Sequence, residues 1–161
     1  MTTPALPWTG GCRCGGVRFE ISAQPLFTSA CHCTGCQRMT AGPYSLSLAV
    51  PSEGFRVTKG EPVLGGLHAL PHFHCGYCMS WLFTRPPGMD WFVNVRAPML
   101  DDTTGYEPFI ETFTNEALPW AKTPARHSYE TFPPMEAYED LLKEYAQLVS
   151  ASRPASGNTG A

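Results

Sequence analysis

Three features that would assign a chain to other protein classes are missing from this sequence. No apolar run approaches the roughly 18 residues of a membrane span, so we expect no transmembrane helix. Residues 1–10 contain no Lys or Arg and no apolar stretch long enough for a secretory signal, so we expect a cytoplasmic protein. The 11 Lys and Arg residues and 14 acidic residues give a net charge of −3, which argues against nucleic acid as the main partner.

Charged residues are scarce, at 16% of the chain, whereas glycine and proline are abundant. The 15 Gly and 16 Pro residues indicate many turns and short strands rather than long helices. A chain of 161 residues is long enough for one domain with a hydrophobic core and short for two. We therefore expect a single, mainly β domain over residues 1–149.

Short segments bounded by Gly or Pro, several of them alternating apolar with polar residues, predict the strands. They are residues 17–21, 44–50, 55–59, 68–74, 80–84, 91–96 and 109–113. One helix is predicted after Pro133 and Pro134, because apolar residues recur at three- and four-residue steps over residues 135–149. Residues 150–161 are small and polar and predict a disordered tail.

All seven cysteines fall in three short clusters. The clusters are Cys12 with Cys14, Cys31 with Cys33 and Cys36, and Cys75 with Cys78. Zinc sites draw thiolates from tight turns, and structural zinc is closed by four protein ligands, whereas catalytic zinc keeps an open position. Two closed sites would need eight cysteines, one more than the chain has. The count therefore predicts two zinc ions, a structural ion with four cysteines and a catalytic ion with three.

Three other uses of cysteine were weighed against zinc. A disulfide framework would leave one thiol over, and a two-residue spacing is poor disulfide geometry. A redox Cys-x-x-Cys pair would be expected in a βαβ pattern, which the sequence does not show. Iron–sulfur ligation would require ferredoxin or Rieske spacings, which are also missing. Zinc remains the favoured interpretation.

The spacing within the outer clusters favours one shared site. In extended backbone Cys12 and Cys14 point to the same face and can reach one ion from a strand or a strand end. Cys75 and Cys78 can supply a second pair from a hairpin-like turn, where Gly76 is expected to adopt the unusual backbone angles. These four cysteines are predicted to form a closed site that joins distant parts of the chain.

The middle cluster has a different geometry. Cys31, Cys33 and Cys36 belong to one short segment, which we expect to be a loop, so they can cap an ion from one side only. Three thiolates and a divalent zinc carry one net negative charge, which makes the metal a weak Lewis acid. Such a site suits a soft fourth ligand, for example a substrate thiol. We predict that these three cysteines bind the catalytic zinc.

Histidine, tryptophan and arginine supply further candidates. His32 is either a group that supports the cysteines or an incidental loop residue, and His72 and His74 could replace a cysteine ligand or carry protons. Core packing is the expected role of the aromatic residues Trp81, Trp91 and Trp120, with lining of an apolar pocket as the alternative. The arginines that could meet a substrate carboxylate are Arg13, Arg18, Arg38, Arg56, Arg85 and Arg96.

Three ordered motifs resemble the glutathione-dependent formaldehyde-activating enzyme (GFA) family, also called the centromere-protein-V-like family. They are GGCRCGGVRFE at 10–20, CHCTGCQRMTAGPY at 31–44 and FHCGYC at 73–78. The resemblance implies a β-tent fold of antiparallel sheets around zinc, with the outer cysteines structural and the middle three catalytic. It also implies that glutathione and formaldehyde are joined into S-hydroxymethylglutathione, a carbon–sulfur lyase reaction. The chain has Met79 where the family usually has Gly, so the backbone at this point is expected to differ.

Three functions follow from these observations. The first is a zinc-dependent carbon–sulfur lyase that uses a thiol such as glutathione and formaldehyde or a related small aldehyde. The alternative is a zinc-stabilised binding module without catalysis, in which an outside group completes the second site. The third is a different zinc chemistry, such as hydrolysis of a small carbonyl compound.

Overall fold

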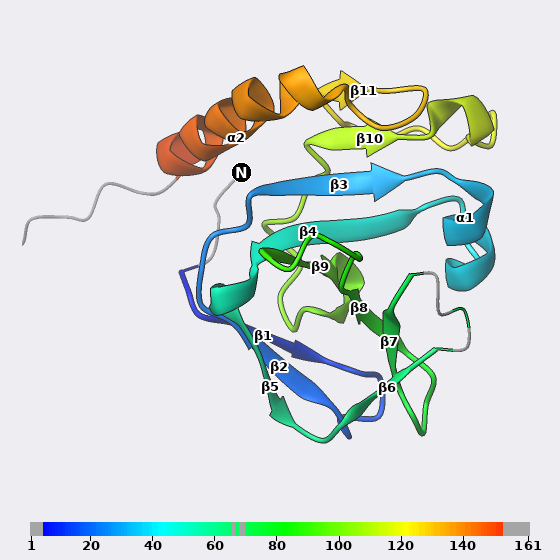
Figure 1. The fold of residues 1–161 in the computed structure, drawn as a ribbon, viewed down its shortest axis with the longest axis vertical. Coiled ribbons are helices and arrows are strands. Elements are labelled where there is room, and N and C mark those ends of the chain that lie inside the picture. Colours follow the sequence, from blue (N-terminus) through cyan, green and yellow to red (C-terminus); the bar gives the residue numbers. More distant parts are fainter. Residues whose placement is uncertain (1–4, 66, 68–69, 153–161) are drawn as a thin grey trace, which may run out of the picture.

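The structure is a computed structural model that describes residues 5–65, 67 and 70–152 (Figure 1). Its strands are β1 (Trp8–Gly11), β2 (Arg18–Ile21), β3 (Phe27–Cys31), β4 (Ser45–Pro51), β5 (Phe55–Lys59), β6 (Pro62–Leu64), β7 (His72–Cys75), β8 (Trp81–Thr84), β9 (Phe92–Arg96), β10 (Ile110–Thr112) and β11 (His127–Ser128). The α-helices are α1 (Thr34–Thr40) and α2 (Tyr138–Ser152). Short 3-10 turns are η1 (Ser52–Gly54), η2 (Ala97–Met99), η3 (Thr114–Glu116) and η4 (Met135–Ala137).

The strands form two sheets. The small sheet has the order β1-β2-β5, and the large sheet has the order β11-β10-β3-β4-β9-β8-β7-β6. Figure 1 shows the small sheet at the bottom of the molecule, and α2 at the top beside the edge formed by β10 and β11. The prediction of a mainly β chain with a C-terminal helix is confirmed.

One part of the sheet prediction needs correction. In the large sheet, every neighbouring pair on the path β3-β4-β9-β8-β7-β6 is antiparallel. At the other edge, β10 runs parallel to both β3 and β11. Parallel neighbours need a long connection between them, and residues 32–109, about half of the chain, separate β3 from β10. Such a pairing depends on tertiary structure, so local alternation of residue types does not reveal it.

The hydrophobic core lies between the two sheets. Phe19 of β2, Phe55 of β5 and Phe83 of β8 are buried, with ring centroids 5.6 Å and 4.9 Å apart along this row. Leu48 of β4 and Val95 of β9 pack into the same cluster. Because side chains alternate along a strand, the core takes one face of β3, β4 and β9 and leaves the other face to different residues.

That other face is polar although its side chains are mostly buried. Cys31 lies opposite Ser45 in the β3–β4 pairing, and Ser47 lies opposite Arg96 in the β4–β9 pairing. Thr84 of β8 continues the row, which then reaches β7. The large sheet therefore carries buried polar groups next to the middle cysteine cluster.

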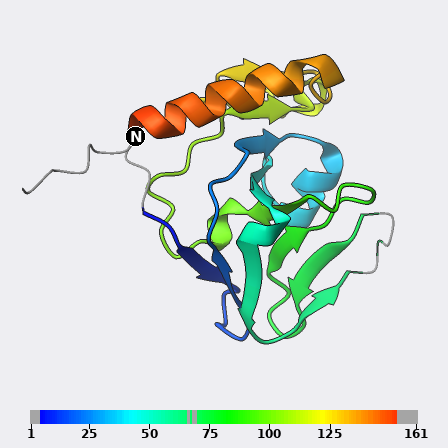
Figure 2. The ribbon, with the colours of Figure 1, turned by 60° about the vertical axis from the view of Figure 1, so that its left-hand side comes forward.

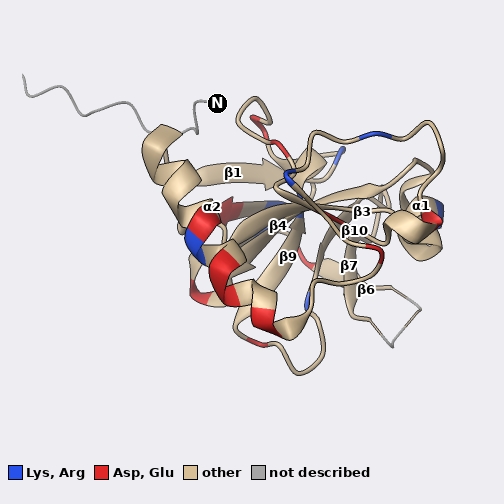
Figure 3. Ribbon diagram, turned by 90° about the horizontal axis from the view of Figure 1, so that it is seen from above, with Lys and Arg blue, Asp and Glu red and all other residues tan. Residues whose placement is uncertain are grey.

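The predicted C-terminal helix packs on the edge of the large sheet (Figure 2). Leu141 of α2 is buried against Phe109 and Ile110, and Tyr145 and Leu148 also contact this cluster. Acidic residues recur along this helix (Figure 3), and Glu139 and Asp140 among them are exposed. No helix in the described ranges is long and apolar enough to cross a membrane. A disordered tail was predicted for residues 150–161, but residues 150–152 belong to α2. Residues 153–161 lie outside the described residues.

Most predicted strands are present, but several elements were missed. Segments 17–21, 44–50, 55–59, 80–84, 91–96 and 109–113 contain or overlap strands of the structure, while 68–74 overlaps β7 and includes residues 68 and 69, which are outside the described residues. The elements missed are β1, β3, β6, β11 and α1. They are short, and β3 has the small and polar sequence FTSAC, which lacks a clear apolar alternation.

The turn between β7 and β8 departs from expectation in its backbone. Gly76 does not have a positive φ; the left-handed residue is Met79, with φ of 59°. Gly76 is constrained by space instead, since an added Cβ would lie 3.1 Å from Val63 Cγ1. Met79 thus holds, with a side chain, the conformation that glycine adopts most readily.

Replacing Met79 by glycine is expected to stabilise the zinc-loaded protein by about 1 kcal/mol, because a side chain in the left-handed region is strained. The Met79 side chain is 64% exposed, so little packing is lost. Denaturant unfolding with zinc in excess measures the change. Met89→Gly is the matched control, since Met89 is also exposed but has no positive φ, and it should destabilise. Equal destabilisation by both substitutions would contradict this account.

Candidate metal centres

The outer cysteine clusters meet between the two sheets. Cys12 and Cys14 follow β1 in the turn that leads to β2, where Cys12 N–H donates to Val17 O at 3.0 Å. Cys75 ends β7, and Cys78 lies in the turn before β8. The Arg13 N–H donates to Ser80 Oγ at 3.2 Å and joins the two turns directly. One turn belongs to each sheet, so this cluster ties the sheets together.

The sulfur positions of this four-cysteine cluster fit a tetrahedral ion. All four Sγ atoms lie within 4.8 Å of one another. The Cys12 and Cys14 sulfurs are 3.4 Å apart, and those of Cys14 and Cys75 are 3.7 Å apart. Zinc–sulfur bonds of about 2.3 Å in a tetrahedron place sulfurs about 3.8 Å apart. The four cysteines could therefore hold zinc with little rearrangement.

Hydrogen bonds favour the thiolate form of two of these four cysteines, Cys12 and Cys78. Burial opposes ionisation of Cys12, but the Val17 N–H donates to its sulfur at 3.2 Å, and its pKa is lowered overall. The side chain and backbone of Ser80 lower the pKa of Cys78 to about 5. Zinc binds thiolates, so these contacts prepare the ligands for the metal.

The middle cluster is built by a strand end and a helix start, and the expectation of one short loop was wrong. Cys31 ends β3, Cys33 is the N-cap residue of α1, and Cys36 lies in the first turn of that helix. Their three Sγ atoms lie within 4.8 Å of one another. Among the described residues, no fourth His, Cys, Asp or Glu side chain joins this set. Three soft donors therefore face one point from one side.

The hydrogen bonds of the three-cysteine cluster are specific. Cys36 N–H donates to Cys33 Sγ at 3.3 Å, and Ser45 Oγ lies 3.1 Å from Cys36 Sγ. A hydrogen bond from Cys36 lowers the pKa of Cys31 to about 5, and the same contact raises the pKa of Cys36. One thiolate is thus already favoured without metal. Metal binding would displace the remaining protons.

Polar contacts fix the segment that carries these cysteines. Gln37 Nε2 donates to His32 O at 2.6 Å and to Glu116 O at 2.9 Å. The Glu116 carboxylate accepts the Thr34 N–H at 2.7 Å. The residues near Glu116 therefore hold the start of α1 in place.

His32 supports this segment and is not an incidental loop residue. Its side chain is 1% exposed, and its Nε2 lies 3.0 Å from Glu111 Oε2. Thr123 and Ser128 also donate to the Glu111 carboxylate, at 2.6 Å and 2.5 Å. Burial alone would raise the pKa of Glu111, but these hydrogen bonds lower it. The His32 side chain thus connects the segment before α1 to β10.

His72 and His74 lie outside both cysteine clusters. His72 Nδ1 is 2.8 Å from Thr84 Oγ1, and the His74 ring stacks on Trp81. Burial lowers the pKa of both histidines, that of His72 to about 4 with a further contribution from Arg96, so both are neutral at pH 7.

Of the tryptophans, Trp81 is buried, whereas Trp91 and Trp120 are 58% and 69% exposed, so core packing was a wrong expectation for those two.

Arg96 is a residue whose special position the sequence did not single out. Four of the six candidate arginines are exposed, namely Arg13, Arg38, Arg56 and Arg85, and Arg18 pairs with Asp101. Arg96 is 5% exposed, and its Nη1 donates to Ser45 Oγ at 3.2 Å. The alternating sequence of residues 92–96 places Arg96 on the polar face, but the contact with Ser45 spans 51 residues and has no local signal.

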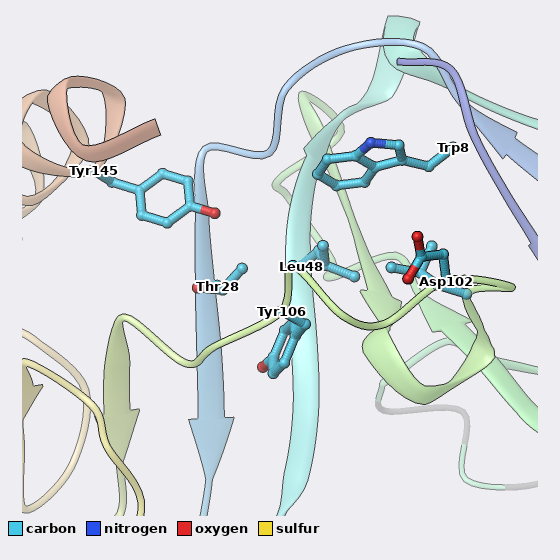
Figure 4. A pocket seen from close by; sticks show the side chains of 8 residues that line it. Trp8, Thr28, Leu48, Asp102, Tyr106 and Tyr145 are labelled. Atoms are coloured by element: carbon cyan, nitrogen blue, oxygen red, sulfur yellow. The ribbon is translucent and has the colours of Figure 1, made fainter. Parts of the chain in front are cut away.

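A surface pocket lies away from both clusters (Figure 4). Trp8, Leu48, Tyr106 and Tyr145 are among the residues that line it, and none of its lining residues is a cysteine. Leu48 faces the side of the sheet opposite to Ser45 and Cys31. This pocket is therefore not part of the candidate metal centres.

The two clusters have different chemical capacities. Four thiolates close a tetrahedral ion and leave no position for a reactant, which is typical of structural zinc. Three thiolates leave a position open, and a soft ligand such as a thiol is the best match for it. The arrangement can thus support a metal-bound thiol at the three-cysteine cluster.

The chain is similar to a solved structure and to a protein-family model. A protein from Rhodobacter sphaeroides with a crystal structure is 20% identical to this chain, with a TM-score of 0.47, and the match covers 62% of this chain and 91% of that one. The family model described as "Glutathione-dependent formaldehyde-activating enzyme" matches residues 7–116, which contain all seven cysteines. Since this match covers more than half of the chain, the chain belongs to the GFA family.

Proposed function

We propose that this protein is a zinc-dependent carbon–sulfur lyase that joins a thiol such as glutathione to formaldehyde or a related small aldehyde. In this proposal Cys12, Cys14, Cys75 and Cys78 bind a structural zinc ion. The catalytic zinc is bound by Cys31, Cys33 and Cys36. Membership of the GFA family supports the choice of reaction. A cytoplasmic location belongs to the same proposal.

One observation carries the proposal: three sulfurs within 4.8 Å of one another, with no fourth protein ligand among the described residues. A purely structural site would be closed by protein. A site that lacks one ligand can accept it from a substrate, and three thiolate ligands favour a thiol over a harder oxygen donor. This is the reason to prefer carbon–sulfur chemistry over hydrolysis.

The chain's own residues prepare this site. Zinc, when bound, supplies an open position that favours the thiolate form of a substrate thiol. The Cys36 N–H and the Ser45 hydroxyl direct hydrogen bonds to Cys33 and Cys36, and these contacts oppose the burial and the neighbouring sulfurs that raise the pKa of both thiols. The contacts of Gln37 and Glu116 hold the start of α1, so the three sulfurs keep their mutual positions.

The proposed reaction is balanced without an oxidant or a reductant. The thiol sulfur forms a bond to the aldehyde carbon, the carbon–oxygen double bond becomes single, and the thiol proton ends on the oxygen. The reverse reaction breaks the carbon–sulfur bond and returns thiol and aldehyde. The residues needed are those that hold the thiol as thiolate close to the carbonyl carbon.

The reaction is tested by exchange NMR on formaldehyde, glutathione and their adduct at equilibrium. Zinc-loaded protein should raise the exchange rate on the order of tenfold or more above the uncatalysed rate. Cys33→Ser should return it to the uncatalysed rate, because one of the three ligands is lost. Arg56→Gln is the matched control and should keep the full rate, since Arg56 is an exposed partner of Glu20.

An exchange rate that stays at the uncatalysed value with several thiols and aldehydes would contradict the lyase proposal. If both metal ions were nevertheless bound, the alternative of a binding module without catalysis would be favoured.

The metal assignment predicts different effects for the two clusters. Cys33→Ser should lower the zinc content from two ions per chain to one and keep the fold, because the three-cysteine cluster lies within one local segment. Cys78→Ser should destabilise the whole domain, because its cluster joins the turns of two sheets. Elemental analysis and thermal unfolding measure both effects. Global unfolding of Cys33→Ser would show that the middle cluster is structural.

A further inference from the structure

The buried Arg96 guanidinium has no carboxylate partner. It is 5% exposed, and none of the ion pairs found in the described part of the chain includes it. Burial of an unpaired charge is unfavourable by several kcal/mol, so buried charges in proteins are almost always compensated. The compensating negative charge therefore has to come from another kind of group.

Most contacts of Arg96 are with neutral groups that do not lead to a negative charge. Its Nη2 donates to Asn94 O at 3.2 Å and lies 3.5 Å from Thr84 Oγ1. Its Cζ lies 4.0 Å from the ring centroid of Trp81, and its Nε has no hydrogen-bond partner. None of these groups carries a negative charge. The stacking on Trp81 holds the plane of the guanidinium in position.

The remaining contact leads to the three-cysteine cluster. Arg96 Nη1 donates to Ser45 Oγ at 3.2 Å, so the Ser45 hydroxyl accepts there and directs its own hydrogen to Cys36 Sγ, 3.1 Å away. This relay fixes the direction of both hydrogen bonds, because a guanidinium can only donate. Ser45 is itself 1% exposed, and water has little access to the relay.

The charges of the two groups complement each other. Three thiolates and one divalent metal ion carry one net negative charge, and Arg96 carries one positive charge. Burial lowers the pKa of Arg96 to about 10, while Cys36 and Cys31 act in the opposite direction, so the side chain stays protonated at neutral pH. In the low-dielectric interior the attraction is stronger than at the surface.

We propose that Arg96 is the counter-ion of the metal-loaded three-cysteine cluster and that Ser45 transmits its charge to the Cys36 sulfur. Arg96 is thus a positioning residue that acts through Ser45. The inference rests on the proposed function in one respect: an incoming thiolate would meet a site of no net charge instead of a negative one. Metal binding itself does not depend on the identity of the reaction.

The test measures metal affinity at the three-cysteine cluster with zinc and with cobalt. Competition with a chelator gives the affinity for the second zinc ion, and the sulfur-to-cobalt charge-transfer band reports on the thiolates. Arg96→Gln should lower the affinity for the second zinc ion on the order of tenfold or more, because the counter-charge is lost. The first ion should stay bound. Arg96→Lys restores the charge and should recover most of the affinity.

Two further variants separate charge from structure. Ser45→Ala keeps Arg96 and should shift the charge-transfer band, because the hydrogen bond to Cys36 Sγ is removed. It also keeps the proposal testable if Arg96→Gln fails to fold. The matched control is Arg85→Gln, because Arg85 is exposed and stacks on Phe83 with 5.9 Å between its Cζ and the ring centroid. This control should retain both metal ions at full affinity.

Unchanged affinity for the second zinc ion in Arg96→Gln would overturn the proposal. So would a loss in Arg96→Lys as large as that in Arg96→Gln, because the charge would then be irrelevant. An unshifted cobalt band in Ser45→Ala would overturn the relay. A protein that shows these effects but no lyase activity would support the counter-ion role and contradict the proposed function, so the two failures are distinguishable.

Discussion

The two sheets of this protein meet through four cysteine sulfurs, and the rest of the structure depends on this junction. Cys14 and Cys75 are 61 positions apart in sequence, yet their sulfurs are 3.7 Å apart. The turns that carry the four cysteines end strands of different sheets, so a metal ion at this point fixes the angle between the sheets. Strands of four or five residues bury limited surface, and a metal ligand set compensates for a small core.

The junction leaves the opposite side of the large sheet free for chemistry. The core fills the face between the sheets, and strand alternation then sends Ser45 and Arg96 to the other face. The three-cysteine cluster lies at the end of β3 on that same face, where Cys31 is paired with Ser45. The four-cysteine and three-cysteine clusters are thereby distinct, although both belong to one small domain.

The sequence alone predicted the elements that depend on local patterns. The grouping of the cysteines follows from spacing, and α2 follows from apolar residues at helical steps. The contacts around the site could not be predicted in this way. His32 and Glu111 are 79 positions apart and Arg96 and Ser45 are 51 apart, and nothing in a local pattern indicates which arginine of six will be buried. The α1 helix is seven residues long, too short to show periodicity, so its cysteines were interpreted as part of a loop.

The central claim is that two zinc ions are held in different environments, one closed by four sulfurs and one open with three. Zinc K-edge X-ray absorption of the two-zinc protein tests this most directly, with and without glutathione. The account predicts about 3.5 sulfur ligands per zinc together with a light-atom ligand, because seven thiolates serve two ions. Bound glutathione should raise this to about four sulfurs and remove the light atom. Four sulfurs per zinc without thiol, or a spectrum that glutathione leaves unchanged, would contradict the account.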